Sequence, residues 1–346
     1  MIIGDIDTDR EVLIIAEIGN NHEGSYSLAE ELIGRAAEAG ANAVKFQTFI
    51  TEHFVSPADE VRFARLKSFE LRFDQFEELS KLAHSLGLLF ISTPLDLYSA
   101  AFLDRVVDAY KIASADNNFF PLIDKVARTG KPVIMSTGIS DLSQVLKSTK
   151  FLKNIWTENL IVGQLAVLHC VSAYPVPPEQ VNLLAIPLLN AALDCSVGYS
   201  DHALGIEACV LAVALGACII EKHFTMDKSF SDFRDHQLSA DPQEMKELIR
   251  KVRLVTTLLG QGQKIVQSCE EHLVCQIRRS IAAGKNMEKG HILEWSDLTW
   301  LRPGEGLRPG DEHLLTGKVL RREVRFGELL LVKDVEEYRH EEELCR

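Results

Sequence analysis

Side chains suited to acid–base, metal and anion chemistry follow short apolar runs at intervals along residues 1–225. The runs occupy residues 12–24, 42–48, 88–94, 109–116, 132–138, 165–175, 196–202 and 219–225. Near their ends stand Glu17, Lys45, Gln47, Thr93, Lys111, Ser114, Ser136, Ser172, Tyr174, His202, Glu221 and His223. A (β/α)8 barrel builds its active site from polar groups at the same end of every strand. The spacing therefore predicts one shared site in a barrel mouth.

Two of these side chains, His202 and His223, are predicted to end the seventh and eighth strands. Adjacent parallel strands lie about 4.8 Å apart, so two imidazoles there can share one metal ion. Two nitrogen ligands leave positions for water and a substrate oxygen, as a catalytic metal requires. No thiolate belongs to the set, so a tightly held structural zinc is not expected. We expect Mn²⁺, with Mg²⁺ or Co²⁺ as alternatives. The competing interpretation is that each histidine only hydrogen-bonds within the mouth.

A second group combines two cations with hydroxyls on the other strands. Two lysines and several hydroxyls suit a ligand that carries both a phosphate and a carboxylate. The group consists of Lys45, Thr93, Lys111, Ser114, Ser136 and Ser200. In the alternative interpretation, the lysines pair with Glu17, Glu221 and Asp116 and bind no ligand.

A lysine that ends a barrel strand is also typical of Schiff-base aldolases. Lys111 or Lys222 could play that part. Lys222 alternates with Glu221 and His223, however, and is expected to face away from the barrel interior. A third, non-enzymatic hypothesis is a carbohydrate- or surface-binding protein that acts through its C-terminal domain.

The segments between the apolar runs show helical periodicity. They cover residues 27–40, 73–87, 120–130, 140–156, 181–193 and 205–217, and one more helix is expected from Pro242 to about Gly260. The strands are almost continuously apolar, as parallel strands buried on both faces are. No G-x-G-x-x-G follows the first strand, and polar residues end all eight strands, which favours a closed barrel over an open doubly wound sheet.

A change of character marks a second domain. We predict a barrel domain over 1–265, a linker over 266–279 and a small all-β domain over 280–336, where short β-type runs alternate with Gly, Pro and Asp turns. Residues 337–346 form a charged tail, expected to be frayed helix or disordered.

The bulk properties exclude several classes of protein. The chain has 346 residues, a net charge of −13 and a pI near 5.4, so no overall field attracts nucleic acid. No apolar run reaches the roughly 18–20 residues of a membrane span, and no secretory signal is recognised at the N-terminus. Seven cysteines without a C-x-x-C indicate reduced thiols in a cytoplasmic protein.

The motifs AEIGNNHEG, VKFQT, FISTP, YKIAS, STGIS, HCVSAYP, GYSDH and EKHFT resemble those of the sialic acid synthase family. Its members condense phosphoenolpyruvate with an N-acetylated amino sugar to give a nine-carbon sugar acid and phosphate. The segments WLRPGEG and LTGKVLRREVRFGELL resemble the antifreeze-like (SAF) domain of that family. The resemblance spans about residues 10–335 and implies a metal-dependent carbon–carbon condensation.

The resemblance also implies a role for individual residues. The metal would be held by His202 and His223, with Glu17 and Glu221 as further catalytic groups. Phosphoenolpyruvate would contact Lys45, Thr93, Lys111, Ser114, Ser136, Ser172 and Ser200. The sugar, an N-acetylated hexosamine, would contact Gln47, Asp116, Tyr174, Asp235 and Arg302. Arg302 would come from the small domain of a partner chain in a domain-swapped homodimer.

Three departures from the family pattern bear on the acceptor. Ser172 stands where asparagine is common, Asp116 stands where glutamate is usual, and SDFRDHQ (231–237) replaces a Pro-Gly-Pro-Asp-His type of segment. All three would lie near the substrate. The acceptor is expected to be N-acetylmannosamine or a close relative. The alternative is a 2,4-diacetamido-trideoxyhexose, which would give legionaminic or pseudaminic acid.

Overall fold

The computed structural model describes residues 1–338, so most of the predicted tail, 337–346, lies outside the described residues. The chain divides into two compact units, Met1–Gly260 and a second that begins at Gln261. The first unit ends before the predicted 265 because helix α11 ends at Leu259 and Gly260 follows with a positive φ of 61°. The predicted linker 266–279 contains a 3₁₀ turn, Glu271–Leu273, and helix α12, Val274–Ile277.

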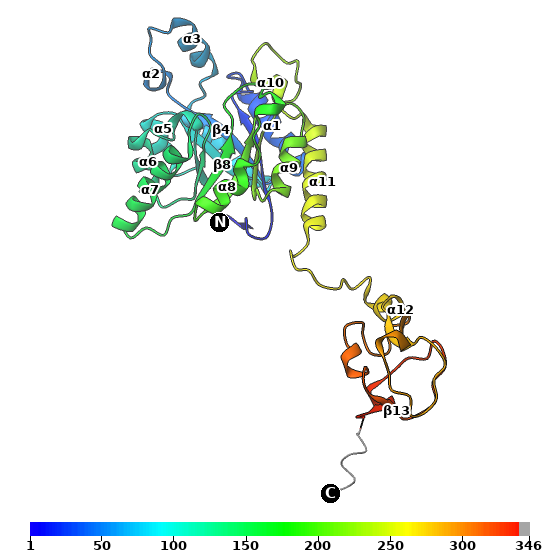
Figure 1. Cartoon of the computed structure of the whole chain (residues 1–346). Helices are drawn as coiled ribbons and strands as arrows, with labels where there is room; N and C mark the ends of the chain where they lie inside the picture. The colour runs from blue at the N-terminus through cyan, green and yellow to red at the C-terminus, as the bar shows by residue number, and fades with distance from the viewer. Residues whose placement is uncertain (339–346) are drawn as a thin grey trace. The chain divides into compact units, whose positions relative to one another are not determined.

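Eight parallel strands close into a barrel in the order β10-β3-β4-β5-β6-β7-β8-β9, which confirms the predicted (β/α)8 fold. Helices surround the strands (Figure 1). The strands are β3 Leu13–Gly19, β4 Ala43–Thr48, β5 Leu89–Pro94, β6 Ala109–Ile112, β7 Val133–Ser136, β8 Leu165–Cys170, β9 Ser196–Asp201 and β10 Ile219–His223. A short antiparallel hairpin, β1 Ile2–Ile3 and β2 Ile6–Asp7, precedes them and was not predicted.

The barrel interior changes from apolar to polar along the strands. Successive strand residues face opposite sides, so an inward residue is followed by the next inward one two positions later. Ile15 thus precedes Glu17, and Ala43 precedes Lys45. The apolar layer, packed with Ile3 of the hairpin, consists of Leu13, Ile15, Ala43, Ile91, Ala109, Ile134, Ala166, Leu168 and Ile219. This layer fills the N-terminal part of the barrel and leaves the polar layer facing the C-terminal mouth.

The outward residues of the strands pack against helices. Helix α1 shows the local reasons for helix formation: the Ser25 side chain accepts the Leu28 N–H at its N-terminus, and Gly40 ends it with φ 91°. Its buried face includes Leu32 and Ile33, each contributing about 1.5–3 kcal/mol by burial. The helices predicted from periodicity are α1 Tyr26–Ala39, α4 Phe73–Ser85, α6 Phe120–Ala127, α7 Leu142–Glu158, α8 Ala185–Ala192, α9 Glu207–Ala214 and α11 Pro242–Leu259.

Four helices of the first unit were not predicted because they are short or mainly polar. They are α2 Thr51–Phe54, α3 Glu60–Phe69, α5 Leu97–Leu103 and α10 Asp235–Leu238. Helix α3 buries only Phe69, so it has no apolar stripe to read. No helix in residues 1–338 has the length and apolar character that crossing a bilayer requires.

The second unit is small and rich in β-structure. Strands β11 Ser280–Ala283 and β12 Leu298–Leu301 pair antiparallel, as do β13 Val319–Leu320 and β14 Val335–Glu336. Its core includes Ile281, Leu293, Leu298, Leu315, Leu320, Val324 and Leu330.

A buried carboxylate, Asp297, accepts hydrogen bonds from three nearby residues of the second unit. It accepts hydrogen bonds from Lys285 Nζ and His291 Nε2, each at 2.7 Å, and from the Glu294 N–H at 2.9 Å. Although burial opposes ionisation, these donors outweigh it and hold the pKa of Asp297 at about 2.

Candidate active site

A single cavity of about 860 Å³ opens at the C-terminal mouth of the barrel. The structure brings every sequence-predicted site residue of the first unit to its lining. They are Glu17, Lys45, Gln47, Thr93, Lys111, Ser114, Asp116, Ser136, Ser172, Tyr174, Ser200, His202, Glu221, His223 and Asp235. Their individual roles stay predictions, but their convergence follows directly from the closed strand order.

The two lysines of the cavity alternate with two glutamates. Lys45 Nζ lies 3.0 Å from Glu17 Oε1 and 3.6 Å from Glu221 Oε2, and Lys111 Nζ lies 3.8 Å from Glu221 Oε1. Lys111 also donates to Ser136 Oγ at 2.6 Å. The alternative interpretation, pairing with glutamates, therefore describes part of the arrangement. It does not exclude a ligand, because the same groups line an open cavity.

The two glutamates experience different surroundings. Burial and the nearby charge of Glu221 raise the pKa of Glu17. Burial opposes ionisation of Glu221 as well, but Lys111, Lys45 and the Ser200 hydroxyl outweigh it and lower its pKa. Ser200 Oγ donates to Glu221 Oε1 at 2.8 Å. Carboxyl groups whose pKa values are pushed apart are suited to different roles, and Glu17 is the one more readily protonated. The sequence could not rank the two.

The predicted histidine pair lies in this cavity. The ring centroids of His202 and His223 are 5.4 Å apart, and both side chains are buried. His202 Nδ1 donates to the Val171 carbonyl at 2.8 Å, which leaves Nε2 as the nitrogen that can face a ligand. Burial favours the neutral form of His202, but the Cys170 side chain and the Val171 carbonyl outweigh it and raise its pKa. His223 Nδ1 is buried without a hydrogen-bond partner among the described residues. Burial, with the positive charge of His202 and Lys45 nearby, lowers the pKa of His223 well below its usual value, which favours the neutral imidazole.

These features fit the donor set of a divalent cation. Neutral imidazole is the form that binds metals, and a backbone carbonyl on the far ring nitrogen is the usual way of orienting such a ligand. Within residues 1–338, no group of three or more His, Cys, Asp or Glu side chains is arranged to hold a metal. A cation here would have two protein ligands and would take its others from water and substrate.

Another part of the cavity lining carries Tyr174, Arg234 and Asp235. Tyr174 packs on His202 with ring centroids 4.1 Å apart, and Arg234 Cζ lies 4.4 Å from the Tyr174 centroid. Arg234 Nε also approaches Asp235 Oδ1 at 3.4 Å. Arg234 therefore lines the mouth, although its side chain is 67% exposed. These groups combine an aromatic ring with hydrogen-bonding side chains.

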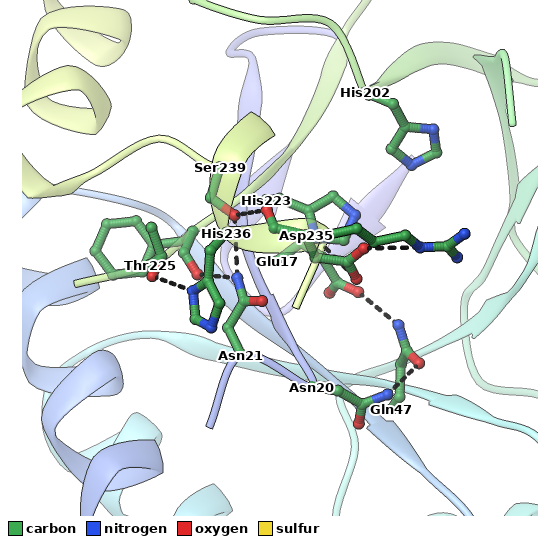
Figure 2. Close-up of polar contacts among 12 residues, drawn as sticks. Glu17, Asn20, Asn21, Gln47, His202, His223, Thr225, Asp235, His236 and Ser239 are labelled. Atoms are coloured by element: carbon green, nitrogen blue, oxygen red, sulfur yellow. Dashed lines mark hydrogen bonds and ion pairs between the residues drawn. The ribbon is translucent and has the colours of Figure 1, made fainter. Parts of the chain in front are cut away.

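A chain of amides orients Glu17 from the same side. Asn20 Nδ2 donates to Gln47 Oε1 at 2.9 Å, and Gln47 Nε2 donates to Glu17 Oε1 at 3.4 Å (Figure 2). Glu17 Oε2 has no hydrogen-bond partner among the described residues.

The serines on the opposite side depend on a glycine. Ser114 Oγ accepts the Gly138 N–H at 3.0 Å. A Cβ at Gly138 would lie 2.2 Å from Ser172 Oγ and 2.9 Å from Ser114 Oγ. The absence of a side chain at this position therefore lets both hydroxyls approach the cavity.

Several cavity residues were missed by the sequence reasoning. Cys170 follows Leu168 in the inward register and could have been found by the same two-residue period. Asn20 lies in the first motif. Arg62 and Arg65 belong to α3, whose pattern gave no signal, and Phe233 belongs to the unusual 231–237 segment.

Lys222 faces away from the cavity, as its alternation with Glu221 and His223 predicts. Its Nζ donates to Asp201 Oδ2 at 2.7 Å. Lys222 is therefore not placed to form a Schiff base with a ligand in the mouth, whereas Lys111 is. The remaining predicted residue, Arg302, follows β12 in the second unit and is exposed there.

Comparison with known proteins gives consistent matches. The chain matches the NeuB family over residues 32–264 and the SAF domain over residues 278–336. The second match confirms the predicted class of the small C-terminal domain.

Individual relatives cover most of the chain. The N,N'-diacetyllegionaminic acid synthase of Legionella pneumophila is 39% identical over 93% of this chain and 94% of its own length. Human N-acetylneuraminate-9-phosphate synthase is 35% identical, covering 88% and 87%. A solved N-acetylneuraminic acid synthetase from Leptospira borgpetersenii superposes with a TM-score of 0.74 at 34% identity, covering 79% of this chain and 94% of that one.

Proposed function

Because this chain belongs to the NeuB family of nonulosonic acid synthases, we propose that it condenses phosphoenolpyruvate and water with an N-acetylated amino sugar, releasing phosphate. The observation that carries this proposal is that two buried lysines, several hydroxyls and two buried histidines line one cavity. A small donor with a phosphate and a carboxylate, and a sugar aldehyde, need those groups side by side.

The lysine–hydroxyl side is the proposed donor site. Lys45 and Lys111 form a cluster with Glu17 and Glu221. Phosphoenolpyruvate would add negative charge at the lysines, with the hydroxyls as further donors to phosphate and carboxylate oxygens. Burial makes these contacts stronger than they would be in water.

The histidine side is the proposed metal site, with His202 and His223 as the protein ligands and Mn²⁺ as the expected ion. A divalent cation bound there would polarise the sugar aldehyde and lower the pKa of a water molecule. Glu17 lies on the strand next to His223, with its free Oε2 in the cavity, and is proposed to hold or deliver the proton.

The aromatic side is proposed to hold the acceptor. Its walls include Phe54, Leu66, Tyr174 and Phe233, which favour an acceptor with apolar substituents. A 2,4-diacetamido-trideoxyhexose carries a second acetyl methyl group and lacks a hydroxyl, so it suits these walls better than N-acetylmannosamine. The similarity to a diacetyllegionaminic acid synthase supports the same choice.

The test measures phosphate release with phosphoenolpyruvate, Mn²⁺ and a panel of acceptors: N-acetylmannosamine, its 6-phosphate and the diacetamido sugar. We expect EDTA-sensitive release, with kcat/KM at least about tenfold higher for the diacetamido sugar. Failure with every acceptor would refute the synthase function. A preference for N-acetylmannosamine would refute only the acceptor assignment.

A Schiff-base aldolase is the second candidate, favoured by one observation: burial lowers the pKa of Lys111, aided by the charge of Lys45. Borohydride trapping of a substrate adduct on Lys111, unaffected by EDTA, would support it. The synthase proposal predicts no such adduct.

Two further features complete the proposal. Arg302 is proposed to reach the acceptor's acetamido group in a partner chain's barrel, within a homodimer. The six described cysteines are all unpaired, which supports a reducing, cytoplasmic location.

A further inference from the structure

A buried ion pair lies directly behind the two histidines. Asp201 and Lys222 are 0% and 1% exposed, and Lys222 Nζ donates to Asp201 Oδ2 at 2.7 Å. The two residues are Cα partners across β9 and β10. Each precedes one histidine in sequence, so the ion pair faces outward while His202 and His223 face the mouth.

The pair also holds the backbone on both sides of His202. Lys222 Nζ donates to the Ala203 carbonyl at 2.6 Å, and the Ala203 N–H donates to Asp201 Oδ1 at 2.9 Å. Residues 201 and 203 are therefore both fixed to the neighbour of His223. A movement of one histidine-bearing strand end relative to the other would break at least one of these bonds.

Every acceptor position of the pair has a partner within this outer layer. Tyr199 OH donates to Asp201 Oδ1 at 2.8 Å, and Cys209 Sγ of helix α9 donates to Oδ2 at 3.3 Å. The carboxylate thus receives donors from β9, β10 and α9. Such a network keeps its geometry, because displacing either charge leaves the other buried and unpaired.

Net stability is a poor explanation for this arrangement. Burying two ions costs several kcal/mol each, and apolar residues of similar volume often stabilise a core equally well. What an apolar pair cannot reproduce is the directional bond to Ala203 and the fixed distance between the two strand ends.

We propose that Lys222 and Asp201 are positioning residues that set the separation and orientation of His202 and His223, and through them the affinity for the divalent cation. This inference rests on the proposed function, since it concerns the cation proposed there. It assigns a role to residues that touch neither substrate nor metal.

The test uses the full chain with Asp201→Leu and Lys222→Met combined, which removes both charges and keeps the core filled. Mn²⁺ affinity is measured without substrates, by the electron paramagnetic resonance signal of free Mn²⁺ during titration. We expect the dissociation constant to rise about 10–100-fold, as for other losses of ligand orientation. The melting temperature should change by only a few degrees, and turnover should recover at raised Mn²⁺.

Two controls make the readout specific. Lys131→Met removes a lysine that donates to the Val107 carbonyl at the other end of the barrel, and should leave Mn²⁺ affinity unchanged. His223→Ala should abolish binding. If the double variant does not fold, Lys222→Gln, which loses the charge but keeps a donor, is measured in its place.

The outcomes distinguish the positioning role from the metal site. Wild-type Mn²⁺ affinity in the folded double variant, or in Lys222→Gln if that replaces it, overturns the positioning role and leaves the proposed function intact. Failure of the unmodified protein to bind Mn²⁺ overturns the proposed metal site itself, and the positioning role with it.

Discussion

Lys45→Met tests the proposed donor site, because Lys45 contacts both buried glutamates of the cavity. Lys45 lies 3.0 Å from Glu17 and 3.6 Å from Glu221, and each attraction is on the order of 5 kcal/mol at an effective dielectric constant of about 20. Without Lys45 the two buried carboxylates lose their shared counter-charge, and phosphoenolpyruvate would meet an excess of negative charge.

The expected loss follows from one charge-assisted contact. Such a hydrogen bond contributes about 1.5–3 kcal/mol, which corresponds to a fall of about 10–150-fold in kcat/KM for phosphoenolpyruvate. Initial rates of phosphate release at varied phosphoenolpyruvate and saturating acceptor give this value. The acceptor KM should change much less.

A matched control shares the substitution but not the site. Lys153 donates to the Asp194 carbonyl at 2.6 Å, outside the mouth cavity, so Lys153→Met should keep wild-type kinetics. An unchanged kcat/KM for phosphoenolpyruvate in folded Lys45→Met, or a loss confined to the acceptor, would refute the assignment of this side of the cavity to the donor.

The remaining predictions concern other parts of the chain. Gly138→Ala should raise the phosphoenolpyruvate KM about fivefold in steady-state assays. The added Cβ displaces the Ser172 and Ser114 hydroxyls, and the weakened hydrogen bonds cost about 1 kcal/mol of binding free energy. An unchanged KM would contradict the role of these hydroxyls. Arg302→Ala should raise the acceptor KM at least about tenfold and spare that for phosphoenolpyruvate, whereas the reverse pattern would remove Arg302 from the sugar site. Asp297, with a pKa of about 2, stabilises the folded state above pH 4 and loses this contribution as pH falls towards 2. The destabilisation caused by Asp297→Asn in urea unfolding should therefore shrink by about 2 kcal/mol between pH 5 and 2, and a pH-independent difference would contradict the pKa.

The sequence was sufficient to predict the barrel and many of the residues that line its mouth. Parallel strands buried on both faces give continuous apolar runs, and their polar ends mark which residues face the mouth. Glu17, Lys45 and His223 could be placed in one cavity without coordinates, because a closed parallel barrel brings all strand ends together.

What the sequence could not give depends on contacts between distant residues. The different surroundings of Glu17 and Glu221 arise from Lys111 and Ser200, which lie on other strands. Helix α3, which contributes to the cavity lining, was not predicted because it has one buried residue and no apolar stripe.

The stoichiometry of the reaction tests the proposed metal-dependent condensation. Protein freed of metal with EDTA is supplied with Mn²⁺, phosphoenolpyruvate and the diacetamido sugar, and the products are quantified by mass spectrometry and phosphate assay. We expect one phosphate for each nine-carbon acid formed, and neither product without Mn²⁺ or sugar. Phosphate release that is independent of sugar, or condensation that proceeds without any divalent cation, would contradict the proposal.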